Sequence, residues 1–206
     1  MNAWEDEAGL LHFDQCLSNT NAFAFVREPS GIFMQPWEVK GALTRWTVDM
    51  GKEDKAITAR EIGPPGDLCR VADADQGRPY NRAWYLSMNP AAKGPPMLGG
   101  PVGANFNALL RIEPGNGRIS LMEIPPGAAI SEPAHVPDGE TGGWLLMVID
   151  VPNSPNPADY ASEVWIVAAD AIEAGPVAKI RTGLPLRSQV HGTWVSRERL
   201  DASKHR

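Results

Sequence analysis

Short apolar runs recur along the whole chain, separated by residues that favour turns. The run Leu43–Val48 alternates between two faces, as a half-buried strand does. The other runs are rich in Val, Ile, Leu and Trp, and most have the length and composition of a strand. They are Leu10–Phe13, Ala22–Val26, Arg82–Met88, Asn105–Ile112, Arg118–Ile124, Trp144–Asp150, Val164–Ala168, Val177–Ile180 and Thr193–Val195.

The segments between these runs favour turns and loops. Glu113–Gly117 contains an Asn-Gly step and predicts a hairpin turn. Asn153–Pro157 predicts an exposed loop, and the Gly- and Pro-rich stretch Pro90–Gly103 a long one. Only Ala168–Ala174 has a helical pattern, ended by Gly175 and Pro176. The pattern therefore predicts an all-β fold. A sandwich, a barrel and a propeller all fit it, and no strict repeat decides among them.

Composition narrows the functional classes. The 206 residues are 43% hydrophobic and 21% charged, which is typical of a globular protein. The net charge of −6 argues against a nucleic-acid-binding surface, which would be basic. No apolar run approaches the roughly 18 residues of a membrane span. Cys16 and Cys69 are far apart in the sequence, which predicts isolated free thiols, a reducing compartment and a cytoplasmic location.

Histidines are the residues that could carry metal chemistry, although no two of them have the spacing of a ligand pair. A single histidine is more often structural than a ligand. His191 differs in setting, because Gly192 beside it permits a close backbone approach. Glu132 ends an apolar run; it either faces water or accepts a ring N–H from a metal-bound imidazole. The four histidines are His12, His135, His191 and His205.

A set of short motifs, in this order and spacing, resembles the C-terminal signature of the carotenoid cleavage oxygenases. Three further stretches (Asn2–Glu5, Leu43–Asp49 and Gly77–Tyr80) are also similar to this family, and they lean toward its lignostilbene-cleaving microbial branch. The resemblance covers nearly the whole chain. The motifs are Ser131–Pro137, Gly143–Leu146, Ala169–Ala171, Gly175–Ala178 and His191–Trp194.

This resemblance implies a fold, a cofactor and a reaction. Residues 1–206 would form the C-terminal portion of a seven-bladed β-propeller domain. An iron ion, Fe(2+), would be held by four histidines, and O2 would split a conjugated C=C bond of a carotenoid, an apocarotenoid or a stilbenoid into two carbonyls. The resemblance makes His191 an iron ligand. It makes Glu132 a carboxylate that supports an iron-bound histidine, and Asp67, more loosely, a second one.

Several positions depart from the family pattern. His135 stands where an aromatic residue is usual, so we do not expect it to bind the metal. Asp67 is one methylene shorter than the usual Glu, and Cys69 replaces a proline. The family's third histidine would fall just before Met1, with the first two further upstream. We therefore expect this chain to lack three of the four iron ligands and to be inactive by itself.

Two alternatives accompany the enzyme hypothesis. One is a non-catalytic truncated fragment with part of the fold. The other is an unrelated all-β binding module, such as a sugar-binding sandwich, which would present tryptophans on one exposed face. The tryptophans of this chain lie mainly within apolar runs, which favours core packing.

Overall fold

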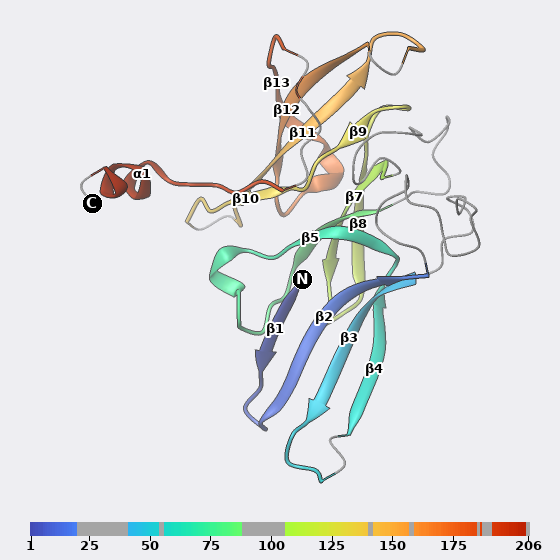
Figure 1. Cartoon of the computed structure of the whole chain (residues 1–206), viewed down its shortest axis with the longest axis vertical. Helices are drawn as coiled ribbons and strands as arrows, with labels where there is room; N and C mark the ends of the chain where they lie inside the picture. Colours follow the sequence, from blue (N-terminus) through green and yellow to red (C-terminus); the bar gives the residue numbers. More distant parts are fainter. Residues whose placement is uncertain are drawn as a thin grey trace.

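A computed structural model describes residues 1–19, 41–53, 56–87, 106–139, 142–156, 159–184, 186 and 191–204. The described parts form three antiparallel sheets and one short α-helix (Figure 1). The all-β prediction is confirmed, and no closed sheet is seen among these residues. The predictions for Ala22–Val26, Pro90–Gly103 and His205 fall outside the described residues.

Each sheet is built mainly from strands that follow one another in the chain. The first sheet has the order β1 (Asn2–Glu5), β2 (Leu10–Ser18), β3 (Gly41–Asp49), β4 (Ile57–Gly63). The middle sheet has the order β5 (Gly66–Arg70), β6 (Ala83–Ser87), β7 (Ala108–Glu113), β8 (Arg118–Glu123). The last sheet has the order β10 (Ala134–Val136), β11 (Trp144–Pro152), β12 (Tyr160–Ala168), β13 (Pro176–Arg181), and β9 (Ala129–Ile130) also pairs with β11.

The predicted hairpin turn between β7 and β8 is confirmed. The Gly117 amide donates to the Glu113 carbonyl over 2.8 Å. Gly117 has a φ of 72°, in the left-handed region that glycine adopts without a Cβ clash. The two strands then pair in register from Glu113 with Arg118 to Ala108 with Glu123.

Two local predictions at the C-terminal end are wrong. Ala168 continues β12 because it pairs with Trp144 in the ladder, and a 3₁₀ turn over Ile172–Ala174 takes the place of the predicted helix. Thr193–Val195 is not a strand, because it pairs with no strand among the described residues.

The α-helix of the structure, α1 (Arg197–Ser203), was not predicted from the sequence. Ser196 caps its start by accepting a hydrogen bond from the Arg199 amide. No residue of α1 is buried. The sequence therefore has only a weak apolar stripe here, and such a stripe is the pattern that usually predicts a helix. The helix follows an extended segment that leaves the sheets (Figure 1).

Strands β6 and β7 of the middle sheet are buried on both faces, whereas the outer strand β8 is mostly exposed. In β6, Trp84 and Leu86 belong to the core shared with the last sheet, whereas Ala83 and Tyr85 belong to the core shared with the first sheet. Alternate side chains of a strand point to opposite faces, so one strand supplies both cores. This explains why the sequence of β6 reads as a continuous apolar run.

A polar cluster lies at the junction of the first and middle sheets. Arg45 on β3 donates two hydrogen bonds, of 2.9 and 2.8 Å, to the carboxylate of Asp14 on β2, whose side chain is fully buried. Tyr80, in the connection between β5 and β6, donates its hydroxyl to the same carboxylate. Burial and this carboxylate raise the pKa of Tyr80, which keeps the hydroxyl protonated as a donor.

The start of β1 is tied to the same junction. The Asn2 side chain donates to the carbonyls of Asp75 and Arg78 and accepts from the Gly77 amide, with distances of 2.9 to 3.0 Å. Two stretches that the sequence analysis singled out, Asn2–Glu5 and Gly77–Tyr80, are therefore in direct contact.

The two cysteines are not isolated from each other. The Sγ atoms of Cys16 on β2 and Cys69 on β5 lie 3.1 Å apart, and both thiols are free. The contact with Cys16 and burial raise the pKa of the Cys69 thiol. The prediction of free thiols agrees with the structure. The prediction that the two cysteines are isolated from each other is wrong, because the packing of two sheets brings distant strands together.

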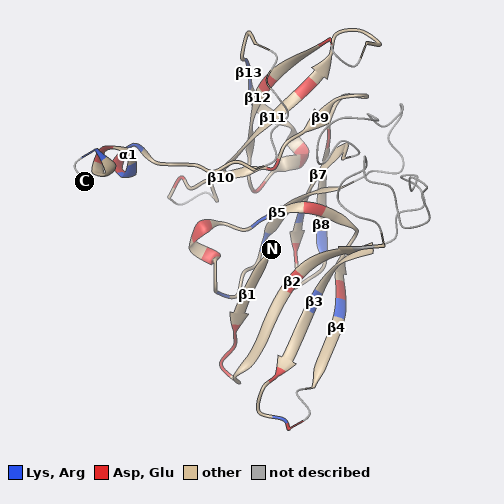
Figure 2. Ribbon diagram, viewed as in Figure 1, with Lys and Arg blue, Asp and Glu red and all other residues tan. Residues whose placement is uncertain are grey.

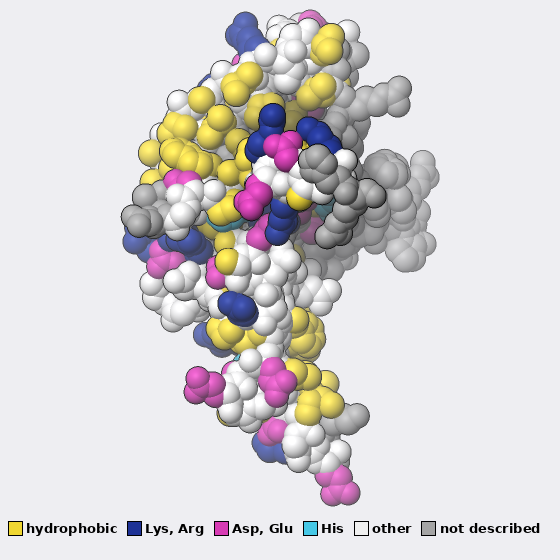
Figure 3. Space-filling model, turned by 90° about the vertical axis from the view of Figure 1, so that its left-hand side faces the viewer, with side chains coloured by type: hydrophobic (Ala, Val, Ile, Leu, Met, Phe, Trp, Pro, Cys, Tyr) yellow, Lys and Arg dark blue, Asp and Glu magenta, His cyan; other side chains and the backbone are white. Residues whose placement is uncertain are grey.

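The last sheet has apolar side chains on both faces. Its inner face contributes Leu145, Met147 and Ile149 to the core. Its outer face carries Trp144 and Leu146, which are partly exposed. Hydrophobic side chains gather on the upper part of the molecule in Figure 3, where this sheet lies.

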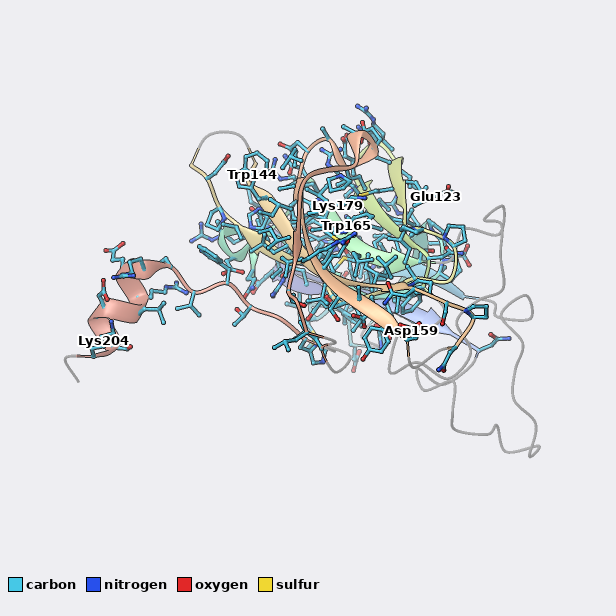
Figure 4. The ribbon with its side chains drawn as sticks, turned by 90° about the horizontal axis from the view of Figure 1, so that it is seen from above. Glu123, Trp144, Asp159, Trp165, Lys179 and Lys204 are labelled. Atoms are coloured by element: carbon cyan, nitrogen blue, oxygen red, sulfur yellow. The ribbon has the colours of Figure 1, made fainter. Side chains whose placement is uncertain are left out.

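A cation covers part of the inner face at the edge strand β13. The Lys179 ammonium lies 4.1 Å from the ring centroid of Trp165 on β12, and Figure 4 shows the two side chains next to each other. A charged residue that points inward on an edge strand opposes pairing with a further strand. Across the molecule, acidic and basic residues are interspersed (Figure 2). None of the helices in the described residues is long and apolar enough to cross a membrane.

We predict that Gly66→Ala destabilises the fold. A Cβ at Gly66 would lie 2.2 Å from the Leu86 carbonyl oxygen, so the backbones of β5 and β6 would have to separate. Overpacking of this kind costs about 1 to 3 kcal/mol. Urea unfolding of the variant measures the loss. Gly115→Ala is the matched control, because a Cβ there meets nothing within 4 Å; an equal loss in both variants would contradict the steric argument.

We also predict that Asp14→Asn destabilises the junction between the first and middle sheets. The change leaves the Arg45 cation without its anionic partner in a largely buried place. Breaking a buried pair in this way costs about 3 kcal/mol. The control is Asp201→Asn, since Asp201 pairs with Arg197 and Lys204 on the exposed α1 and should lose less than about 1 kcal/mol. Similar losses in the two variants would show that burial adds nothing to the Asp14 pair.

Candidate metal-ligand site

His191 and Glu132 form a hydrogen-bonded pair, although they lie 59 positions apart in the chain. The Nδ1 atom of His191 is 3.0 Å from Oε2 of Glu132. The imidazole is 75% exposed, whereas the carboxylate is only 11% exposed. Because a carboxylate can only accept, the ring proton lies on Nδ1, and the neutral ring carries its lone pair on Nε2. Among the described residues, no protein group bonds to Nε2, so this atom is available to a ligand.

Glu132 is placed by the strands on either side of it. It follows β9 (Ala129–Ile130) and precedes β10 (Ala134–Val136), both of which pair with β11. Ser131 holds the turn by accepting from the Val148 amide over 2.8 Å, and its own amide donates to the Val148 carbonyl. Pro133 on the other side is fully buried. The position of the carboxylate is therefore set by the last sheet.

The same carboxylate also holds the backbone beyond His191. Oε2 of Glu132 accepts from the Gly192 amide over 3.3 Å. The expected need for a glycine there is not found: a Cβ at Gly192 would meet Ala134 at 3.8 Å, which is an ordinary contact. Glu132 thus receives two donors from the His191–Gly192 segment, one from the ring and one from the chain.

Arg70 is a residue of this site that the sequence analysis did not single out. Its Nη2 donates to the Gly192 carbonyl over 2.6 Å, and its Nε donates to the Pro133 carbonyl over 3.4 Å. The guanidinium therefore bridges the chain just after His191 and the chain just after Glu132. Its position directly after Cys69 and three residues after Asp67, both of which the sequence analysis named, was the signal that could have found it.

Asp67 lies on β5 and has a local partner. Its Oδ1 accepts from the Leu68 amide over 2.7 Å. Leu68 has a φ of 52°, which is uncommon for a residue with a large side chain. In the described residues Asp67 makes no hydrogen bond to an imidazole. The prediction that it supports an iron-bound histidine stays a prediction, because no contact of the described residues tests it.

His135 is buried and belongs to the core, away from His191. Its ring stacks on Trp84 with centroids 5.1 Å apart, and its Nε2 lies 2.8 Å from the Gly142 carbonyl. Ala134 packs toward Gly192, and the next side chain of a strand points to the opposite face. This geometry agrees with the expectation that His135, which stacks as an aromatic residue does, is not a ligand.

His12 is also accounted for by protein partners. Its two ring nitrogens lie 2.9 Å from Thr47 Oγ1 and 2.8 Å from Asp6 Oδ2, and the ring stacks on Trp4. Within the described ranges there is no group of three or more His, Cys, Asp or Glu that could hold a metal ion. The described residues thus offer one exposed imidazole with a free nitrogen, His191, and a carboxylate that orients it. The Nδ1 atom of His135 also has no partner, but it is buried.

Comparison with known proteins identifies the family. Residues 1–196 match the family described as "RPE65: Retinal pigment epithelial membrane protein". The chain is 29% identical over 210 residues to lignostilbene-alpha,beta-dioxygenase isozyme III of Sphingomonas paucimobilis, covering 99% of this chain and 41% of that protein. It is 27% identical to resveratrol cleavage oxygenase 1 of Aspergillus fumigatus, covering 94% of this chain and 40% of that protein.

Solved structures show the same fold. The crystal structure of Pseudomonas brassicacearum lignostilbene dioxygenase superposes with a TM-score of 0.78 at 22% sequence identity, over 94% of this chain and 40% of that one. Cobalt-substituted Synechocystis apocarotenoid oxygenase gives a TM-score of 0.72 at 22% identity, over 94% of this chain and 38% of that one.

These matches define the class as oxygenases of the carotenoid and stilbene cleavage type. The chain belongs to the RPE65, or carotenoid oxygenase, family, and it spans about two fifths of the length of its curated relatives. The family resemblance seen in the sequence is confirmed, and the unrelated sugar-binding sandwich is excluded.

We predict that Glu132→Ala changes the protonation pattern of the His191 ring. A hydrogen bond to a charged group contributes about 1.5 to 3 kcal/mol, so its loss should shift the ratio of the two neutral tautomers by roughly tenfold or more. Nitrogen-15 NMR of the ring measures this ratio. Glu132→Gln keeps an acceptor and should shift the ratio less, and Glu123→Ala on β8 is the control. An unchanged ratio in Glu132→Ala would show that the carboxylate does not select the tautomer.

Proposed function

We propose that this chain supplies one imidazole, that of His191, to the iron centre of an oxygenase that cleaves a conjugated C=C bond. The observation that carries the proposal is the 3.0 Å contact between Nδ1 of His191 and the carboxylate of Glu132, which in the neutral ring places the proton on Nδ1 and the lone pair on Nε2 of an exposed imidazole. A metal-bound histidine usually donates its second ring N–H to such a partner, which orients the ring and raises its basicity.

The residues present fit an iron ion as a partial ligand set. His191 would hold the metal through Nε2, Glu132 would accept the proton on Nδ1 and so orient the ring, and other ligands would come from outside the described residues. When bound, Fe(2+) would supply the binding and activation of O2. Neutral imidazoles suit this ion, and a single one binds it only weakly.

The proposed reaction balances with O2 as the co-substrate. A conjugated R–CH=CH–R′ and one O2 give R–CHO and R′–CHO, so one C=C bond is broken and each carbon gains one oxygen atom. The relatives are named for lignostilbene and resveratrol, which are stilbenes, so we propose a stilbenoid substrate ahead of a carotenoid or an apocarotenoid.

We further propose that the three sheets are consecutive blades of a seven-bladed propeller. Each sheet is an antiparallel meander, and neighbouring sheets pack face to face through shared cores. The partly exposed apolar outer face of the last sheet, with Trp144 and Leu146, would then pack against the next blade. This chain spans about 40% of the length of each relative, so the remaining length of such a protein would supply the other blades.

A second candidate is a non-catalytic truncated fragment. The absence of a metal-holding cluster from the described part of the chain favours it for the isolated 206 residues. The nucleotide sequence immediately upstream of the Met1 codon separates the two. An open frame that encodes a histidine just before Met1 favours the enzyme, and a stop codon there favours the fragment.

We predict that the isolated chain neither retains iron nor turns over a stilbene. One imidazole cannot hold Fe(2+) through desalting, because affinity comes from several preplaced ligands. Metal analysis and detection of the two aldehydes by mass spectrometry test this, using a 4-hydroxystilbene and an apocarotenal as substrates. In a longer protein that includes the upstream segment, turnover should appear and be lost in His191→Ala but retained in His12→Ala. Stoichiometric iron and turnover in the isolated chain would refute the proposal that this chain supplies a single iron ligand, His191.

A further inference from the structure

Three stretches from different parts of the chain meet at His191. They are the end of β5, the turn between β9 and β10, and the segment that follows the last sheet. Glu132 accepts from both the ring of His191 and the amide of Gly192. The remaining polar groups of this junction, the carbonyls of Gly192 and Pro133, both accept from Arg70.

We propose that Arg70 is the positioning residue that sets the direction of His191. Its guanidinium, a planar fork of donors, spans the two carbonyls that follow Glu132 and His191. Glu132 holds residue Gly192 at its N–H, and Arg70 holds the same residue at its carbonyl. Two points of attachment on one segment determine an orientation, whereas the carboxylate alone would permit the segment to rotate about a single anchor.

The local backbone of β5 supports this role. Asp67 pairs with Leu86 and Arg70 pairs with Trp84, so three steps along β5 match two steps along β6. This extra residue is a β-bulge, a feature that re-aims side chains. Leu68 within it has the uncommon φ of 52°, a strained conformation that costs on the order of 1 to 3 kcal/mol and tends to persist where function needs it.

The bulge separates three neighbouring side chains. Leu68 enters the core shared with the last sheet, and Cys69 packs against the core shared with the first sheet. Arg70 then reaches the Pro133 and Gly192 carbonyls. Asp67 holds the bulge by accepting from the Leu68 amide. Asp67 therefore influences the position of Arg70, because it stabilises the bulge that directs the Arg70 side chain.

This proposal rests on the proposed function in one respect only: an iron centre is the reason that the direction of His191 matters. It concerns the local geometry, which can be measured in the 206-residue chain without metal. An absence of turnover in the longer protein would refute the proposed function and leave this measurement unaffected.

The test compares Arg70→Met with Arg70→Lys and with the control Arg60→Met, which removes an exposed arginine from β4. Hydrogen exchange of the Gly192 amide and nitrogen-15 NMR of the His191 ring are the local readouts, and urea unfolding is the global one. We expect about tenfold faster Gly192 exchange in Arg70→Met, an intermediate change in Arg70→Lys, which can satisfy one carbonyl, and none in Arg60→Met. The His191 ring signals should move in parallel.

Two results would overturn the proposal. One is Gly192 exchange within twofold of the parent chain in a folded Arg70→Met, with unchanged ring signals. The other is loss of the whole fold in both Arg70→Met and Arg70→Lys, which would make Arg70 a support of the sheets in general. The proposal is supported if Arg70→Met speeds Gly192 exchange and moves the His191 ring signals while its unfolding midpoint equals that of the Arg60→Met control. Arg70→Lys should then show a smaller change in both local readouts.

Discussion

Burial of strands β6 and β7 of the middle sheet on both faces is the constraint on which the rest of the structure depends. Its strands alternate between two cores, so Trp84 and Leu86 join it to the last sheet while Ala83 and Tyr85 join it to the first. Burying apolar surface is the main favourable term in folding, and here one sheet contributes to both interfaces. Strands of this kind have no face left for water, so they need a neighbouring sheet on each side.

The polar features of the molecule follow from this stacking. Where sheets meet, backbone and side-chain polar groups lose water and need partners from the neighbouring sheet. Asp14, Arg45 and Tyr80 satisfy one another at the first junction. At the second, the Trp84 indole donates to the Ala169 carbonyl over 2.8 Å. The last sheet has one covered face and one partly exposed apolar face, as a sheet within a longer stack would.

The candidate site lies at the edge of this stack, where the constraints change. His191 is exposed, and it is held from behind by Glu132 on the last sheet and through Gly192 by Arg70 on the middle sheet. A side chain on an extended segment has little packing of its own to define its direction. Hydrogen bonds from two rigid sheets supply that definition, and the strained bulge at Leu68 is consistent with a backbone shaped for this purpose.

The sequence by itself determined the class of the fold and the members of the central pair. Alternation and turn residues give the strands at Leu43–Val48 and Trp144–Asp150 because strand period and turn chemistry are local properties. The motifs around Glu132 and His191 pointed to the same pair that the structure brings to 3.0 Å. Only the tertiary structure decided which strands share a face, that Cys16 meets Cys69, and that Arg70 reaches Gly192. These contacts join residues 53 and 122 positions apart, and no local pattern encodes them, because they depend on how whole sheets pack and on where a single bulge turns the chain.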